Sequence, residues 1–204
     1  MVAAKKVVIL ISGRGSNMRA IVEADIPNMN VVAIIANRAD ASGINWASQQ
    51  GIEHAVLEHR QFAQREAFDV ALLSLIDHYQ ADFVILAGFM RVLSPRFVAH
   101  FPQQIINIHP SLLPAFPGLH THRRALAAGC HFSGCTVHFV TTQLDHGPII
   151  AQAVVPIYRD DTEATLSARV LLEEHRIYPQ AVADLVNGHL IVDGMRVYRH
   201  FPEK

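Results

Sequence analysis

The chain has 204 residues, half of them hydrophobic, and a formal net charge of −1 with histidine neutral. This size predicts a single domain over residues 1–204, and the near-neutral charge argues against a nucleic-acid partner or an anionic membrane surface. Two cysteines are too few for a disulfide framework, and no apolar run approaches the ~18 residues of a membrane helix. We therefore expect a cytoplasmic protein with small-molecule partners.

Strands and helices alternate through the first half of the chain. Short apolar runs predict buried strands at residues 5–11, 30–36, 53–56, 83–87 and 105–108. Helical periodicity or composition predicts helices at residues 18–24, 41–50 and 62–79, and Ser94 and Pro95 mark the start of another. This alternation predicts an α/β fold with an open, doubly wound, mainly parallel sheet, whose first half, residues 1–106, is Rossmann-like.

The second half, residues 107–204, has a different pattern. A helix is predicted at residues 121–128, and antiparallel strands at residues 131–140 and 149–155. Asp161 or Thr162 caps a long helix, which Pro179 would kink or restart. Residues 190–197 have the pattern of a β-hairpin turning at Asp193 and Gly194.

A glycine-rich turn follows the first strand, with Gly13 and Gly15 ahead of Ser16 and Asn17. Glycine lets the main chain approach a ligand, and free N–H groups at a helix N-terminus favour a phosphate. The P-loop pattern is absent, and Met18 stands where a dinucleotide-binding motif needs its third glycine. The turn therefore predicts a monophosphate site, with a purely structural turn as the alternative.

Asn107 and His109 lie two positions apart at the end of a predicted strand, so their side chains share one face. Pro110 ends this strand, and ligands bind at the carboxyl ends of such strands. An amide can donate to an oxyanion and an imidazole can move a proton near neutral pH. The alternative is a capping Asn beside a buried structural His.

Three further sites are weaker on pattern alone. Arg91 follows a strand in an apolar loop that could line an anionic ligand, or simply connect strand to helix. Asp145 is either a turn residue or the carboxylate returned toward His109, and Glu174 is an acid on an apolar helical stripe. The histidines and cysteines lack zinc-type spacing, the best cluster being Cys130, His131, Cys135 and His138, so no metal is predicted.

These motifs together resemble the folate-dependent phosphoribosylglycinamide formyltransferase family over nearly the whole chain. The resemblance rests on residues 11–17, 87–95, 107–118 and 144–148. It implies formyl transfer from 10-formyltetrahydrofolate to the amine of N1-(5-phospho-D-ribosyl)glycinamide in de novo purine biosynthesis, with the second half of the chain as the catalytic and folate-binding half. It also implies no metal, and a monomer or homodimer.

The resemblance implies a role for each matching residue. The catalytic residues would be Asn107, His109 and Asp145. The ribonucleotide would be held by Gly15, Ser16, Asn17 and Glu174. The folate would be contacted by Arg65, Met90, Arg91, Val92, Leu93, Asn107, Thr141 and Asp145.

The expected mechanism is direct attack of the substrate amine on the formyl carbon, with Asn107 and protonated His109 stabilising the oxyanion and Asp145 favouring the imidazolium. One alternative is the 10-formyltetrahydrofolate hydrolase of the same superfamily, which carries an extra N-terminal domain. Methionyl-tRNA formyltransferase adds a C-terminal domain and a basic surface. A non-enzymatic nucleotide-binding module would leave the three catalytic candidates without a task.

Overall fold

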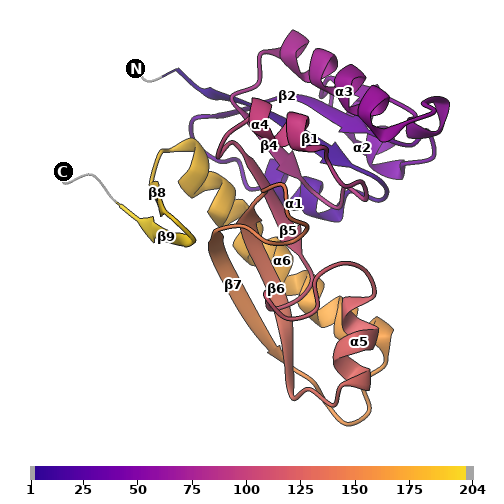
Figure 1. Cartoon of the computed structure of the whole chain (residues 1–204), viewed down its shortest axis with the longest axis vertical. Coiled ribbons are helices and arrows are strands. Elements are labelled where there is room, and N and C mark those ends of the chain that lie inside the picture. Colours follow the sequence, from indigo (N-terminus) through magenta and orange to yellow (C-terminus); the bar gives the residue numbers. More distant parts are fainter. Residues whose placement is uncertain (1–2, 201–204) are drawn as a thin grey trace. The chain divides into compact units, whose positions relative to one another are not determined.

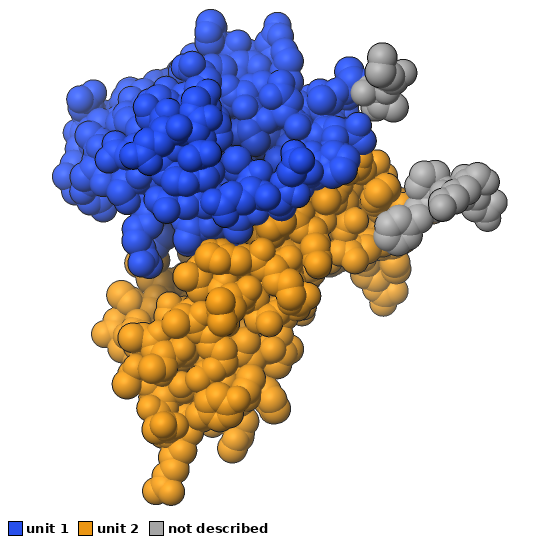
Figure 2. All heavy atoms as spheres, turned by 180° about the vertical axis from the view of Figure 1, so that it is seen from behind, with its two compact units in different colours: residues 1–107 blue, residues 108–204 orange. Residues whose placement is uncertain are grey.

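The computed structural model describes residues 3–200 and contains two compact units, Met1–Asn107 and Ile108–Lys204 (Figure 2). The expected boundaries at residues 1 and 204 lie outside the described residues. No helix among residues 3–200 is long and apolar enough to cross a membrane.

Unit 1 is built on parallel strands that pair in the order β3-β2-β1-β4-β5 (Figure 1). Its strands are β1 (Lys5–Ile11), β2 (Met29–Ala36), β3 (His54–Val56), β4 (Phe83–Leu86) and β5 (Ile105–His109). Its helices are α1 (Ser16–Glu23), α2 (Ser42–Gln49), α3 (Arg65–Tyr79) and α4 (Pro95–His100), with a 3-10 helix, η1 (His59–Gln61). The side chains of residues 7–11 and 33–36 are fully buried, as expected for strands covered on both faces.

The order of these strands places the ligand crevice. The chain continues from β1 to β2 on one side and later adds β4 on the other side of β1. In open α/β sheets, ligands bind outside the carboxyl ends of the strands at such a reversal. The loops that follow β1 and β4 are therefore the expected binding loops of unit 1.

Unit 2 contains an antiparallel pair of strands with a long helix against it. Its elements are α5 (Thr121–Ala127), β6 (Phe132–Phe139), β7 (Ile149–Pro156), α6 (Glu163–Val186), β8 (Leu190–Asp193) and β9 (Arg196–Arg199). β6 and β7 pair antiparallel, α6 packs on both of them, and β8 and β9 form a hairpin. The full sheet has seven strands in the order β3-β2-β1-β4-β5-β6-β7, which confirms the predicted fold class.

Sequence pattern and structure differ at several places. α1 begins at Ser16, two residues earlier than predicted. α3 begins at Arg65 rather than at residue 62, because Phe62 and Gln64 have extended main-chain conformations. Pro179 does not restart α6, which continues through it without interruption. The final hairpin turns at Gly194, where φ is 57°, and β9 ends at Arg199, two residues later than predicted.

Candidate active site

The turn after β1 offers main-chain groups to a ligand. Gly15 has φ 71°, a left-handed conformation that glycine adopts without strain, and it is the N-cap of α1. A Cβ on Gly15 would lie 2.6 Å from the Cε atom of Met18. The N–H of Gly43 donates to the carbonyl of Gly13 at 3.1 Å, which holds the turn against α2. This is a local structure that can bind an anion through N–H groups.

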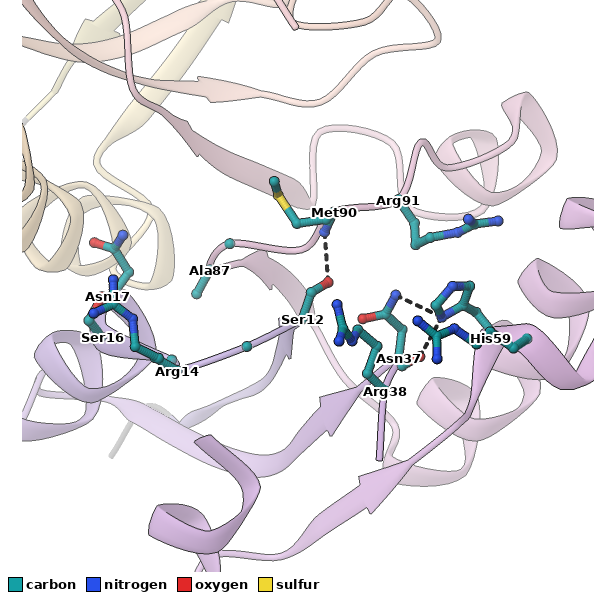
Figure 3. Close-up of a pocket in the computed structure, with 14 residues that line it drawn as sticks. Ser12, Arg14, Ser16, Asn17, Asn37, Arg38, His59, Ala87, Met90 and Arg91 are labelled. Atoms are coloured by element: carbon teal, nitrogen blue, oxygen red, sulfur yellow. Dashed lines mark hydrogen bonds between the residues drawn. The ribbon is translucent and has the colours of Figure 1, made fainter. Parts of the chain in front are cut away.

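The loop after β4 lies beside this turn. The hydroxyl of Ser12 accepts a 2.7 Å hydrogen bond from the main-chain N–H of Met90, and the N–H of Ser12 donates to the carbonyl of Gly88 (Figure 3). The other end of the loop is fixed by buried Asp69, which accepts from the N–H of Ser94 at 2.6 Å. The predicted folate-binding residues Met90 and Arg91 thus lie on a loop held at both ends.

The turn and the loop enclose a pocket of about 360 Å³ within unit 1. Ser16 and Asn17 lie toward one end of this pocket, and Arg38, His59 and Arg91 lie toward the other (Figure 3). The pocket therefore contains predicted residues for both substrates, together with basic residues that the sequence did not single out.

His109 ends β5, and its side chain is 7% exposed. Its Nε2–H donates to the main-chain carbonyl of Phe116 at 3.0 Å, and its Nδ1 lies 3.5 Å from an Oδ2 atom of Asp145. The carbonyl of Phe116 thus accepts from one ring nitrogen, and the carboxylate of Asp145 lies within ion-pair distance of the other. This geometry brings together the predicted carboxylate and imidazole.

The carboxylate of Asp145 is also held by a main-chain N–H group. Its Oδ2 atom accepts a 2.7 Å hydrogen bond from the N–H of Gly118, and its side chain is 9% exposed. The residue has φ 47°, a conformation that Asp adopts more readily than most residues. The proline-rich segment after His109 therefore supplies contacts both to the imidazole, through Phe116, and to the carboxylate, through Gly118.

Thr136 on β6 anchors that segment. Its buried hydroxyl donates to the carbonyl of Ser111 at 2.7 Å and accepts from the N–H of Leu113 at 3.0 Å. Gln152 on β7 donates to the same hydroxyl and to the carbonyl of Leu113. The two bonds to Ser111 and Leu113 are buried, and a satisfied buried network of this kind rigidifies the segment that it joins.

Two histidines near the pair are kept neutral by their surroundings. Burial lowers the pKa of His138, with opposing contributions from a hydrogen bond to Phe139 and from the charge of Asp145. Burial also lowers the pKa of His122, against the charge of Glu163. Both shifts disfavour further positive charge around His109.

The remaining predicted residues occupy varied surroundings. Asn107 precedes His109 on β5 and pairs in register with Leu86, while Glu174 is a 7% exposed acid on α6. Arg65 is exposed, and its guanidinium pairs with Glu66 rather than lining the pocket at the glycine turn. The hydroxyl of Thr141 donates to the carbonyls of Gln143 and His146, which closes the turn before Gly147.

The loop at Val92 and Leu93 is divided between surface and core. Val92 is 47% exposed and Leu93 is 6% exposed. Among residues 3–200 no group of three or more His, Cys, Asp or Glu side chains is arranged to hold a metal ion. Burial raises the pKa of Cys135, one of the considered ligands, to about 12, so this thiol is a poor metal ligand at neutral pH.

Comparison with known proteins decides between the candidate families. The model of the formyl transferase family matches residues 5–182. The chain belongs to the formyl transferase family. It is 49% identical over 187 residues to the phosphoribosylglycinamide formyltransferase of Escherichia coli K12, covering 90% of this chain and 88% of that protein.

Other formyl transferase relatives agree. The crystal structure of glycinamide ribonucleotide transformylase 1 from Symbiobacterium toebii matches with a TM-score of 0.92 and 45% identity, covering 96% of this chain and 93% of that one. The human trifunctional purine biosynthetic protein adenosine-3 is 43% identical over 186 residues, which are 90% of this chain and 18% of that protein. The recognition made from the motifs is therefore confirmed.

Sequence reasoning missed several residues of this formyl transferase. Thr136 lies inside a predicted strand that also carries Ser133 and His138, so its residue type gave no signal of its own. The carbonyl of Phe116 had none, because a main-chain acceptor in an irregular segment leaves no trace in residue type. Asn37 and Arg38 directly follow β2, and the strand-end rule applied to Asn107 could also have found them.

Proposed function

We propose that Asn107, His109 and Asp145 carry out the formyl transfer that this chain catalyses. The reaction moves the formyl group of 10-formyltetrahydrofolate to the amine of N1-(5-phospho-D-ribosyl)glycinamide, a step of purine biosynthesis that uses the folate as co-substrate. The observation that carries the proposal is the buried contact of 3.5 Å between His109 Nδ1 and Asp145 Oδ2.

The reaction needs no protein nucleophile, because the substrate amine attacks the formyl carbon itself. A C–N bond forms, and the carbonyl oxygen becomes an oxyanion. The side-chain amide of Asn107 and an N–H of His109 donate to that oxygen, which lowers the barrier. The bond to N10 of the folate then breaks, and the proton lost by the amine reaches N10 directly or through water.

The contacts of His109 indicate how its ring acts. The carbonyl of Phe116 accepts from Nε2, and the carboxylate of Asp145 lies at ion-pair distance from Nδ1, so an oxyanion that accepts from the ring must displace one of these two neighbours. The contact with Asp145 is the longer of the two, at 3.5 Å against 3.0 Å. Asp145 supplies negative charge beside an imidazolium, and Gly118 keeps that carboxylate in place.

The proposal also assigns the residues that bind the two substrates. Gly15, Ser16 and Asn17 hold the phosphate of the ribonucleotide through N–H groups, and Glu174 accepts hydrogen bonds from its ribose. The folate is contacted by Arg65, Met90, Arg91, Val92, Leu93, Asn107, Thr141 and Asp145. The pocket at the glycine turn and the fixed loop after β4 support the assignments of Gly15–Asn17, Met90 and Arg91. The other assignments rest on the resemblance of the sequence motifs.

A product assay separates the proposed transferase from the hydrolase and from a nucleotide-binding module. We expect the purified chain to form N-formyl ribonucleotide and tetrahydrofolate in equal amounts when both substrates are present. A hydrolase would release formate from 10-formyltetrahydrofolate without the ribonucleotide. A nucleotide-binding module would bind the ribonucleotide and leave the folate unchanged. Either of these last results would contradict the proposal.

The chain acts on small molecules, and we propose that it does so in the cytoplasm as a monomer or homodimer.

A further inference from the structure

Residues 116–119 of unit 2 contact both His109 and Asp145 through main-chain groups. The carbonyl of Phe116 accepts from Nε2 of His109 at 3.0 Å, and the N–H of Gly118 donates to Asp145 at 2.7 Å. Phe116 and Gly118 both have left-handed conformations, with φ of 53° and 77°. An aromatic residue rarely adopts this conformation, and it persists only where the surrounding contacts hold it. The segment therefore depends on its supports.

Arg124, on helix α5, contacts this segment at three points. Its Nη1 atom donates to the carbonyl of Pro117 at 2.5 Å and lies 3.5 Å from the carbonyl oxygen of Leu119. Its guanidinium carbon also lies 5.4 Å from the centroid of the Phe116 ring, a distance at which a cation is attracted to an aromatic face. One side chain thus binds the residues on both sides of Gly118.

The guanidinium of Arg124 is directed to this segment rather than to an acid. Among residues 3–200, no carboxylate lies within ion-pair distance of Arg124. At the beginning of the segment, the hydroxyl of Ser111 donates to the carbonyl of Ala115 at 2.6 Å. Ser111 therefore supports the beginning of the segment, and Arg124 supports its end.

The peptide between Pro117 and Gly118 links the guanidinium to the carboxylate. The carbonyl of Pro117 and the N–H of Gly118 belong to one planar, trans peptide unit, so the two groups point in opposite directions. The carbonyl accepts from Arg124, and the N–H donates to Asp145. A donor at the carbonyl therefore fixes the rotation of the peptide plane. It also polarises the amide, which strengthens the hydrogen bond at the other end.

We propose that Arg124 is a positioning residue for formyl transfer, an inference that rests on the proposed function. It acts through the peptide between Pro117 and Gly118, which holds the carboxylate of Asp145 beside His109. A charged group lies at each end of this peptide, and charge-assisted hydrogen bonds are stronger than neutral ones. Removing the guanidinium frees the peptide plane to rotate, so Asp145 loses its fixed place beside the imidazole.

The first test separates turnover from substrate binding. Arg124→Met keeps a long side chain beside Phe116 and removes the donors. We expect kcat to fall about 5- to 10-fold, the effect of roughly one hydrogen bond, while KM for each substrate changes less than about twofold. Arg124→Lys keeps a cationic donor and should recover most of the turnover. Arg123→Met alters the adjacent exposed arginine of α5 and should keep parental kinetics. Parental kcat in Arg124→Met would overturn the inference.

A second substitution separates positioning from a general loss of structure. In single-turnover assays of Asp145→Ala, adding Arg124→Met should lower the rate less than about twofold, because the carboxylate that it positions is already absent. The full loss in that background would overturn the inference, since Arg124 would then act by another route. Failure of the proposed function is distinct, because Asp145→Ala itself would then keep parental turnover.

The amide proton of Gly118 gives a measurement without turnover. A short, charge-assisted hydrogen bond shifts the NMR signal of such a proton downfield. In the isotope-labelled chain we expect this signal to move upfield in Arg124→Met and to stay in place in Arg123→Met. An unmoved Gly118 signal in Arg124→Met would contradict the inference, because the peptide plane would then keep its orientation without the guanidinium.

Discussion

The glycine turn and the segment around His109 present hydrogen-bond donors by opposite means. Around Gly15 the donors belong to the main chain, and a left-handed residue sets their direction. Around His109 the donor is a side chain, and its orientation depends on the carbonyl of Phe116, the carboxylate of Asp145 and the buried hydroxyl of Thr136. Adding a methyl group should therefore impair ligand binding at the glycine turn. Removing a polar atom should impair the segment around His109.

The largest effect is expected at the side-chain donors. Replacing Asn107 or His109 by Ala removes one donor to the oxyanion, which typically costs ~10²–10³ in turnover. We expect that loss in kcat while both variants still fold, as circular dichroism would show. The exposed His131 of unit 2 offers a matched control, since His131→Ala should keep parental turnover. Near-normal turnover in both Asn107→Ala and His109→Ala would contradict the catalytic assignment.

The next largest effect is expected on stability, when the hydroxyl of Thr136 that anchors the segment after His109 is removed. Thr136→Val keeps the shape of the side chain but deprives the carbonyl of Ser111 and the N–H of Leu113 of a buried partner. We expect the free energy of unfolding to fall by about 1–3 kcal/mol, measured in urea. Thr142→Val replaces an exposed threonine and should change it little. Equal stability of the two variants would show that the buried hydroxyl is not an anchor.

A methyl group on the glycine turn tests the main-chain region. Gly15→Ala places Cβ at φ 71° and 2.6 Å from the Cε atom of Met18, at a cost of about 1–2 kcal/mol. We expect KM for the ribonucleotide to rise about tenfold, with KM for the folate nearly constant. Gly51 has φ 69° and open space around it, so Gly51→Ala carries similar backbone strain away from the pocket. If both variants change KM equally, strain alone explains the effect.

The smallest effect is expected in the pH dependence of stability. Burial lowers the pKa of His122 and of His138, so below about pH 6.5 the unfolded chain binds protons that the folded chain refuses. Stability therefore falls on acidification through that range and is unaffected above it. Urea unfolding of His122→Gln should lose less stability between about pH 7.5 and 5.5 than the parent does. His131 is exposed, so in His131→Gln the free energy of unfolding should change with pH as it does in the parent chain. The same pH dependence in His122→Gln would contradict the prediction.

The contrast between main-chain and side-chain groups also explains which parts of the fold and of the site could be predicted from the sequence. The apolar run at Lys5–Ile11 has its predicted bounds, because burial on both faces leaves an unbroken pattern in the sequence. α3 was predicted three residues too early, since Phe62 and Gln64 have extended main-chain conformations that composition does not reveal. The motifs gave the family, whereas the carbonyl of Phe116 depends on a left-handed conformation at a non-glycine residue and could not be foreseen.

The basic residues Arg38 and Arg60 were missed for a different reason. Arginine is common on protein surfaces, and only the folded positions of the loops after β2 and β3 bring these two to one pocket. The folate contact of Arg65 is implied by the resemblance alone and stays a prediction. In the structure its guanidinium pairs with Glu66.

The coupling between Asp145 and His109 is tested most directly by the pH profile of kcat in Asp145→Asn. The substitution keeps an oxygen that can accept from Gly118 and removes the negative charge 3.5 Å from the imidazole. The account predicts that the acid limb of the profile is displaced from that of the parent chain, with reduced turnover. Superimposable profiles would contradict it, because the carboxylate would then have no influence on the proton state used in the reaction.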